Sequence, residues 1–343
     1  MTQETHQVLV TGGSGYIAGF CIAGLISQGY AVRTTVRSLS REAEVRASLS
    51  KIANLGDRLS FVAADLNSDE GWAAAVAGCR YVLHVASPLP TSNPKNDDDL
   101  IRPARDGALR VLKAAKDAGV ARVVMTASTA AICYGRGSRD IPFTEADWSD
   151  ETNRKDTSAY ERSKTIAERA AWAWMAKEGG ALELTTIAPG AVLGPVLGQD
   201  FSASLEIVRK LLQGALPGLP RFGWPLVDVR DIADLHIRAM TSPAAAGQRF
   251  IGAGPFLWMK DIAAVLKTHA PDISKKVPTN PIPNWLIRLS ASFDTLVRDR
   301  LFELDKHRPI SADKARTLLG WSPRTNEQSI LDTARSLVAE GQV

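Results

Sequence analysis

Tyr160 and Lys164 lie four residues apart in the segment SAYERSK, a spacing that could support acid–base chemistry. Residues four apart on a helix share one face, so the phenol and the ammonium would be neighbours. The pKa of a phenol is about 10, roughly three units above neutral pH, so a tyrosine is a weak proton donor there. A nearby lysine cation would stabilise the phenolate and lower the pKa of the phenol. The pair therefore indicates proton transfer at a substrate oxygen, although the same spacing also occurs on ordinary surface helices.

A serine earlier in the chain extends this pair to a candidate catalytic set. Ser128 follows the apolar run Arg122–Thr126, which has the composition of a buried strand. We therefore expect Ser128 in a crevice at the end of that strand, where its hydroxyl could hold a carbonyl oxygen. The helix that carries Tyr160 and Lys164 is expected to start near Ser158 and to end at Gly179-Gly180.

The N-terminal stretch VLVTGGSGYIAGFCIAG has the pattern of a phosphate site. An apolar strand at Val8–Val10 precedes a glycine turn, and helical spacing begins at Tyr16. Glycines let the backbone approach a pyrophosphate, whose charge meets the free N–H groups at the start of the helix. The spacing is G-x-x-G-x-x-A, and its context between a strand and a helix predicts dinucleotide binding rather than an ordinary turn. The expected contacts are Gly12, Ser14, Gly15, Tyr16 and Ile17.

The residue after the second expected strand bears on the choice of dinucleotide. Ala31–Val36 is β-branched and ends in Arg37, and no acidic residue lies between Arg33 and Arg41. An acidic residue there would hold the ribose 2′-hydroxyl of NAD, whereas an arginine accommodates the 2′-phosphate of NADP. Arg37 therefore favours NADP(H). The alternative is a solvated arginine at a strand end.

Two further strand ends supply expected cofactor contacts. Asp65 and Leu66 follow a strand at Leu59–Ala63, where they could meet the adenine, and Asp65 could also cap the next helix. Tyr81–Ala86 is expected beside the first strand and places Val85, Ala86 and Ser87 at the crevice. His84 within it is expected to be a packed core histidine, and Leu89–Asn96 is expected to form a loop.

The alternation of strands and helices predicts an α/β fold, a Rossmann-type doubly wound parallel sheet with a smaller C-terminal α/β substrate lobe. Further strands are expected at Leu182–Ile187 and Gln248–Ile251, a helix at Phe201–Gly214, and a helix capped by Asp231 that continues through His236. We expect the NADP-binding domain to span residues 1–189, with returning segments at about 225–251. The substrate lobe would then comprise residues 190–224 and 252–343.

Aromatic residues are concentrated in the expected lobe. Phe222 and Trp224 lie in an irregular stretch and could line an apolar pocket, although such residues often form a lobe core. Trp285, Leu286, Leu289, Phe293 and Leu296 recur at helical spacing. Because no basic polar face accompanies them, we expect them to form lobe core rather than a membrane face.

The composition excludes several classes of protein. The chain has 343 residues, of which 45% are hydrophobic and 23% charged, so it can bury a full core. A balance of 41 basic and 37 acidic residues does not suggest nucleic-acid binding. The sequence shows no apolar run of membrane-spanning length and no metal-ligand spacing, and Cys21, Cys79 and Cys133 are widely separated. We expect a cytoplasmic protein without a metal, a monomer or homodimer, with reduced cysteines.

The segments TGGSGYIAG, TAS ending at Ser128 and YERSK resemble the cofactor turn and the Ser-Tyr-Lys triad of extended short-chain dehydrogenases/reductases. VRTTVRS, TIAERAAWAW, IAPGAVLGP, LVDVRDIADLH and LGWSPR are similar to the dihydroflavonol reductase and cinnamoyl-CoA reductase branch, which includes NADPH-dependent aldehyde and ketone reductases. The resemblance covers nearly the whole chain. It implies that Tyr160 protonates a carbonyl oxygen as hydride arrives from the nicotinamide, with Ser128 and Lys164 assisting. It also implies cofactor contacts from Thr126, Pro189, Gly190 and Val192.

Two departures from the branch narrow the expected substrate. Cinnamoyl-CoA reductases carry the longer signature N-W-Y-C-Y-x-K, and this chain has Thr157-Ser158-Ala159-Tyr160 instead, which weakens the case for a CoA-thioester substrate. Cys133, beside Tyr134, stands where dihydroflavonol reductases place an asparagine, which weakens a flavonoid. A small or aromatic aldehyde or ketone is expected instead, in contact with Pro88, Cys133, Tyr134, Phe222 and Trp224.

Other functions remain open at this point. A nucleotide-sugar epimerase or dehydratase shares the triad but commonly retains NAD, which Arg37 disfavours. A hydroxysteroid-type dehydrogenase that runs toward oxidation is a further alternative. A regulator that senses NADP(H) without turnover would often lack the tyrosine, whereas Ser128, Tyr160 and Lys164 are all present.

Overall fold

The large sheet of the protein has seven parallel strands. The computed structural model describes residues 6–88, 94, 96–198 and 203–343. The strand order is β3-β2-β1-β4-β5-β6-β9, and every neighbouring pair is parallel. The strands are β1 (Gln7–Val10), β2 (Ala31–Val36), β3 (Leu59–Ala63), β4 (Cys79–His84), β5 (Arg122–Thr126), β6 (Glu183–Pro189) and β9 (Arg249–Gly252). This arrangement confirms the expected doubly wound α/β fold.

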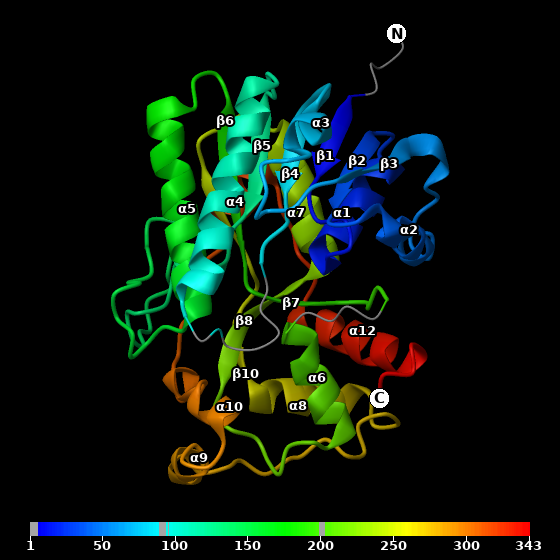
Figure 1. Cartoon of the computed structure of the whole chain (residues 1–343). Helices are drawn as coiled ribbons and strands as arrows, with labels where there is room; N and C mark the ends of the chain where they lie inside the picture. The colour runs from blue at the N-terminus through cyan, green and yellow to red at the C-terminus, as the bar shows by residue number, and fades with distance from the viewer. Residues whose placement is uncertain (1–5, 89–93, 95, 199–202) are drawn as a thin grey trace.

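Helices cover both faces of this sheet, because successive side chains of a strand point to opposite faces (Figure 1). Val8 and Val10 belong to one core cluster, which packs under α1 (Tyr16–Ser27), α2 (Glu42–Leu49) and α7 (Val229–Thr241). Leu9 belongs to another cluster, under α3 (Trp72–Val76), α4 (Asp98–Asp117) and α5 (Ala159–Glu178). The side chains of Val8, Leu9 and Val10 are fully buried, as expected for the centre of a parallel sheet.

The strand order reverses direction at β1, which lies between β2 and β4. Ligands of doubly wound sheets bind outside the carboxyl ends of the strands at such a point. The glycine turn follows β1 and the Val85–Ser87 segment follows β4, so both lie at this crevice.

A second layer of structure lies below the carboxyl ends of the large sheet (Figure 1). Its small sheet has the order β10-β8-β7, formed by β7 (Ala191–Leu193), β8 (Gly223–Asp228) and β10 (Phe256–Trp258). Its core cluster joins these strands to α6 (Ala203–Gln213), α8 (Met259–His269) and α12 (Asn326–Ala339). Three short helices complete the C-terminal part, α9 (Asn284–Ser290), α10 (Thr295–Arg298) and α11 (Asp313–Leu319). Single 3₁₀ turns are η1 (Leu39–Arg41), η2 (Gly56–Arg58), η3 (Thr129–Ala131), η4 (Pro243–Ala245) and η5 (Leu301–Glu303).

The expectation that Asp231 caps α7 is wrong. Asp228 is the N-cap, and its carboxylate accepts a hydrogen bond from the Arg230 amide at 2.9 Å. Asp231 lies in the first turn of α7 and accepts from the backbone amide of Arg324 at 2.7 Å. Its carboxylate therefore fixes the C-terminal segment rather than the start of the helix.

The expectation that the helical repeat near residue 290 forms lobe core is also wrong. Trp285, Leu286, Leu289 and Phe293 are 66%, 42%, 52% and 87% exposed, while the side chain of Leu296, the last member of the repeat, lies outside the described residues. Ile287, one position off the repeat, is the residue of α9 that is buried. The helix is too short for its period to decide which face packs inward. Within the ranges given above, no helix combines the length and apolar character needed to cross a bilayer.

Candidate active site

The turn after β1 is shaped to bring backbone close to a ligand. Gly12 has a φ of +73°, a conformation that favours glycine. A Cβ on Gly13 would collide with the Thr34 side chain, and one on Gly12 would lie 3.0 Å from the Cβ of Ala86. The amides of Gly12 and Gly13 donate to the Thr35 hydroxyl and carbonyl, both at 2.9 Å. The turn is therefore fixed from below by β2, while its other side stays open.

The N-terminus of α1 is the feature that could hold a phosphate. The helix begins at Tyr16, its N-cap Gly15 offers no side-chain cap, and its first turn contains no acidic residue. The first amides of an α-helix have no acceptor within the helix and carry partial positive charge. Glycines without Cβ atoms leave room for a pyrophosphate directly over these amides. The predicted set Gly12, Ser14, Gly15, Tyr16 and Ile17 thus fits a dinucleotide.

Thr11 joins this turn to the end of β4, a role that the sequence analysis missed. Its hydroxyl accepts from the amides of Val85 and Ala86, both at 3.0 Å. It is then left to donate to Nδ1 of His84 at 2.9 Å. Burial lowers the pKa of His84 to about 3, so this histidine is neutral and belongs to the core. The bonds set the position of Val85 and Ala86 beside Gly12.

The side of the crevice where the adenosine is expected contains the predicted Arg37 and a second arginine that was not predicted. Arg37 directly follows β2, and its side chain is exposed. Arg41 lines a hollow that also includes Gly13, Ser14 and Gly15, and it forms an ion pair with Glu44 at 2.8 Å. Its position in a helical turn, rather than on a strand end, gave no signal in the sequence.

Asp65 and Leu66 lie on the loop after β3. The Asp65 carboxylate accepts from the Asn67 amide at 2.8 Å. The next helix, α3, starts at Trp72 with Gly71 as its N-cap, so the alternative that Asp65 caps a helix is wrong. Leu66 packs against Gly107 of α4, where a Cβ would lie 2.8 Å from that of Leu66.

The predicted catalytic residues come from two elements that pack together. Ser128 is the N-cap of η3, and its hydroxyl accepts from the Ala130 amide at 3.1 Å. The start of α5 is fixed by a capping box, in which Ser158 accepts from the Tyr160 amide and Glu161 accepts from the Ser158 amide. α5 contacts both η3 and β6, so its first turn holds Tyr160 next to Ser128.

The expectation that Lys164 lowers the pKa of Tyr160 is not met. Burial raises the pKa of Tyr160 to about 12, and the neighbouring Ser128 hydroxyl and the charge of Arg300 only partly oppose this. The Lys164 Nζ lies 5.7 Å from the centroid of the Tyr160 ring and donates to the Ser87 hydroxyl at 2.8 Å. Burial also lowers the pKa of Lys164 to about 8, against the charge of Glu168. The phenol is therefore fully protonated near neutral pH.

The remaining predicted cofactor contacts differ in what they offer. The Thr126 hydroxyl is paired with Nε2 of His236 at 2.7 Å, while Nδ1 of His236 bonds the Ile232 carbonyl at 2.8 Å. The Thr126 hydroxyl is thus engaged below the crevice. Pro189 ends β6, and Gly190, where a Cβ would collide with the Pro225 carbonyl, leads into β7 with the buried Val192. These residues connect the two sheets at the expected nicotinamide end.

The predicted substrate contacts are not equally available. Cys133 is 1% exposed, and the Tyr134 hydroxyl donates to Glu303 at 2.8 Å within the core. Phe222 and Trp224 lie 6.2 Å apart between ring centroids and pack against the small-sheet core. Pro88 follows Ser87 and is partly buried, while residues 89–93 and 95 of the expected loop lie outside the described residues. The pocket assignments stay predictions, and Tyr134 has no free hydroxyl to offer.

The buried ion pair of Glu168 and Arg249, one helical turn after Lys164, was not predicted from the sequence. Glu168 is fully buried and binds Arg249 of β9 at 2.8 and 3.0 Å and the Thr186 hydroxyl at 2.7 Å. Its place one turn after Lys164 was the available signal. Its arginine partner comes from a distant segment and could not be inferred from local spacing.

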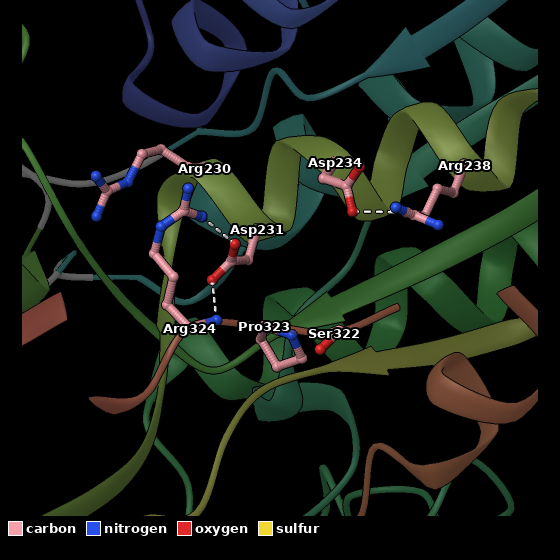
Figure 2. A pocket seen from close by; sticks show the side chains of 7 residues that line it. All are labelled: Arg230, Asp231, Asp234, Arg238, Ser322, Pro323 and Arg324. Carbon is pink, nitrogen blue, oxygen red and sulfur yellow. Dashed lines mark hydrogen bonds and ion pairs between the residues drawn. The ribbon is translucent and has the colours of Figure 1, made fainter. Parts of the chain in front are cut away.

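Another hollow, on the outer side of α7, resembles an anion site but is already neutralised (Figure 2). Arg230, Arg238 and Arg324 line it, and each is paired with aspartate. Asp228 and Asp332 bind Arg230, Asp234 binds Arg238, and Asp231 binds Arg324. At this hollow the C-terminal LGWSPR segment packs against α7. The indole N–H of Trp321 donates to the Asp231 carbonyl at 2.9 Å. Among the residues of known placement, no group of three acidic, histidine or cysteine side chains could hold a metal.

Comparison with known proteins agrees with this geometry. The family whose model matches residues 8–251 is described as the NAD dependent epimerase/dehydratase family. Tetraketide alpha-pyrone reductase 1 of Arabidopsis thaliana is 34% identical over 308 residues, which cover 86% of this chain and 89% of that protein. Cinnamoyl-CoA reductase 1 of Arabidopsis thaliana is 33% identical over 339 residues, which cover 98% of this chain and 90% of that protein. The solved structure of yeast methylglyoxal/isovaleraldehyde reductase with NADPH is 26% identical and has a TM-score of 0.82, covering 98% of this chain and 100% of its own.

Proposed function

Because this chain belongs to the NAD dependent epimerase/dehydratase family, we propose that it is a carbonyl reductase that uses NADPH. Its substrate is a small or aromatic aldehyde or ketone, and its product is the alcohol. The relatives named above are reductases, and the solved yeast relative holds NADPH. The chain is accordingly an oxidoreductase of the extended short-chain type with NADP(H) as its cofactor.

The observation that carries the proposal is the position of the Tyr160 phenol beside the Ser128 hydroxyl at the crevice. The pKa of Tyr160 is about 12, so the residue holds its proton at neutral pH. Reduction of a carbonyl needs a proton at oxygen and a hydride at carbon. The Tyr160 phenol holds the proton for the first requirement, although its raised pKa makes it a weaker acid than an exposed phenol, and NADPH supplies the hydride when bound.

In the proposed reaction, the hydroxyls of Ser128 and Tyr160 both contact the substrate oxygen. Ser128 orients the carbonyl, and Tyr160 transfers its phenolic proton as negative charge develops on that oxygen. Lys164 has lost its proton at about pH 8, before the resting phenol titrates at about 12, so it does not lower that pKa. Below pH 8 the ammonium is charged when the proton is transferred, and it stabilises the phenolate that results. Ser87 accepts from the Lys164 ammonium at 2.8 Å and so fixes its position during the step.

The cofactor contacts follow from the same crevice. The uncapped start of α1 holds the pyrophosphate, and Arg37 holds the 2′-phosphate of the adenosine ribose. Pro189, Gly190 and Val192 lie along the nicotinamide end, where β6 passes into β7.

The proposal is tested by following NADPH oxidation at 340 nm with a panel of aldehydes, ketones, flavanonols and acyl-CoA esters. We expect turnover with aldehydes or ketones, and weaker turnover with NADH. Tyr160→Phe should lower kcat by about 10²–10⁴ while NADPH still binds. Ser163→Ala, which alters a hydroxyl on the same helix that bonds the Tyr160 carbonyl, is the matched control and should keep most of kcat. Unchanged turnover in Tyr160→Phe would contradict the assignment, and so would silence across the panel with NADPH bound.

A further inference from the structure

Ser149, in the segment that precedes α5, contacts the turn that carries Ser128. It is fully buried, and its hydroxyl donates to the Ala130 carbonyl at 2.7 Å and accepts from the Tyr134 amide at 2.8 Å. Its own amide donates to the Ala131 carbonyl at 3.0 Å. The last carbonyls of a helical turn have no donor within the turn, so Ser149 satisfies those of η3. A residue from outside η3 therefore closes this turn.

Ala130 connects Ser149 to the predicted catalytic serine. The Ala130 amide donates to the Ser128 hydroxyl at 3.1 Å, and the Ala130 carbonyl accepts from the Ser149 hydroxyl. The Ser128 hydroxyl uses one acceptor site for this bond and keeps its own proton for donation. Two hydrogen bonds through one residue thus fix the Ser128 oxygen and leave its proton for a substrate oxygen.

Ser149 is itself anchored to α5, the helix that carries the catalytic tyrosine and lysine. The Cζ of Arg249 lies 3.7 Å from the centroid of the ring of Trp148, the residue before Ser149. Arg249 also donates to the Asp147 carbonyl at 2.9 Å. The same guanidinium is bound at 2.8 Å by Glu168 of α5. This buried ion pair thereby fixes the segment of Ser149 relative to α5.

We propose that Ser149 is a positioning residue of the reaction, whose hydroxyl holds the Ser128 hydroxyl, through Ala130, in place to donate to the substrate oxygen. The inference rests on the proposed carbonyl reductase function and adds a residue that acts through Ser128 rather than on the substrate. A hydroxyl that assists proton transfer must stay within hydrogen-bond distance of the oxygen on which charge develops. A misplacement of about 1 Å can cost about 10²-fold in rate, so a loosened turn should be visible in kcat.

A double-mutant cycle separates this role from a general loss of stability. We would measure kcat and KM for the native protein, Ser149→Ala, Ser128→Ala and the double variant, with NADPH and the best carbonyl substrate of the panel above. Ser149→Ala should lower kcat by about 10- to 100-fold in the native background. With Ser128→Ala it should lower kcat by less than about twofold, because the hydroxyl that it would misplace is already gone. The KM for NADPH should stay within about twofold, because the bonds of Ser149 hold η3 and Tyr134, whereas the glycine turn is held by β2.

Thr185→Val is the matched control for the loss of a buried hydroxyl. Thr185 is fully buried in β6, and its hydroxyl donates to the Ala245 carbonyl at 2.6 Å. The variant should lower the free energy of unfolding in urea, as Ser149→Ala does, and leave kcat unchanged. If Ser149→Ala does not fold, Ser149→Cys, whose thiol is a weaker donor, takes its place in the cycle.

Hydrogen exchange of the Ala130 and Ala131 amides, followed by mass spectrometry, gives a readout without turnover. We expect both amides to exchange at least about tenfold faster in Ser149→Ala than in the native protein and in Thr185→Val. An unchanged kcat, unchanged exchange at these amides, or an equal loss of kcat with and without the Ser128 hydroxyl would overturn the inference. Faster exchange without turnover of any carbonyl would support the positioning of the turn by Ser149 and contradict the proposed reaction. Turnover of carbonyls with no effect of Ser149→Ala on kcat or on exchange would do the reverse.

Discussion

Two opposing effects set the chemistry of Tyr160. Burial raises the pKa of its phenol, while the Ser128 hydroxyl and the Arg300 cation lower it, and burial dominates. The same burial acts in the opposite direction on Lys164, since it disfavours the charged form of either group. The acid is therefore held protonated, and the lysine is held close to its titration point.

The pH dependence of reduction should report on Lys164. Its pKa is about 8, below the ordinary lysine value, so the ammonium is present below that pH and is lost above it. We expect kcat/KM to fall above about pH 8, as measured by initial rates of NADPH oxidation between pH 6 and 10. Lys164→Met should be slower at every pH and lack this limb. A rate that stays level to pH 10 in the native protein would show that the charge is not needed.

Arg37 should set the preference between dinucleotides. Its guanidinium follows β2 and would pair with the 2′-phosphate, which NADH lacks. Arg37→Ser should raise the KM for NADPH by about 10- to 100-fold and leave the KM for NADH within about twofold. Equal changes for both cofactors would mean that Arg37 is only a surface residue. The parallel variant Arg41→Ser, in the hollow beside the glycine turn, would show whether the unpredicted arginine shares this role.

At the scale of elements, the turn between β1 and α1 is the most constrained part of the site. Gly13→Ala would place a methyl group against Thr34, whose hydroxyl donates to the Val10 carbonyl at 2.7 Å. We expect the turn to shift away from β2 and NADPH to bind at least about tenfold more weakly, as measured by fluorescence titration. Gly24→Ala in α1, which would meet the tip of Ile237 instead, is a control expected to change stability more than NADPH affinity.

The elements themselves were largely predictable from sequence, for a physical reason. Strands buried on both faces, such as Val8–Val10, are short continuous apolar runs that can be recognised in the sequence. The start of α5 can be recognised from the capping box at Ser158. β7 and β10 have three residues each and carry no periodicity to detect. The prediction of the buried face of α9 was wrong because a helix of seven residues is compatible with more than one apolar face. The predicted capping role of Asp231 was wrong because its actual partner, Arg324, lies far along the chain.

The candidate site divides in the same way. The glycine turn, Ser128, Tyr160 and Lys164 lie in local motifs. The parallel sheet brings the ends of β1 and β5, which the turn and Ser128 follow, to one edge, and α5 packs there with Tyr160 and Lys164. Thr11 and Glu168 act through neighbours from other segments. Their roles depend on the packing of the end of β4 beside the glycine turn and of β9 against α5, which no local spacing specifies.

At the scale of the whole molecule, the buried Glu303 links the two layers and should make stability depend on pH. Burial raises its pKa from 4.5 to about 7, despite the attraction of Arg308. Such a carboxyl group stabilises the fold fully below pH 4.5 and loses this contribution as the pH rises through 7. Between pH 5 and 8 the native protein should lose up to roughly 3 kcal/mol relative to Glu303→Gln, measured by urea unfolding. The same pH dependence of the free energy of unfolding in both proteins would contradict this. Glu340→Gln, which removes a carboxylate from an exposed ion pair, is the control.

The contact between α1 and α7 has a consequence for the synthesis of this chain. α1 ends at Ser27, and eight of its residues, Phe20, Leu25 and Ile26 among them, are buried in the finished fold. The helix that covers it begins only at Val229 and is followed by the edge strand β9. A ribosome therefore extends most of the polypeptide before the side of the first helix that faces α7 is covered. During that interval the nascent chain exposes apolar surface of the kind that aggregates or that chaperones protect.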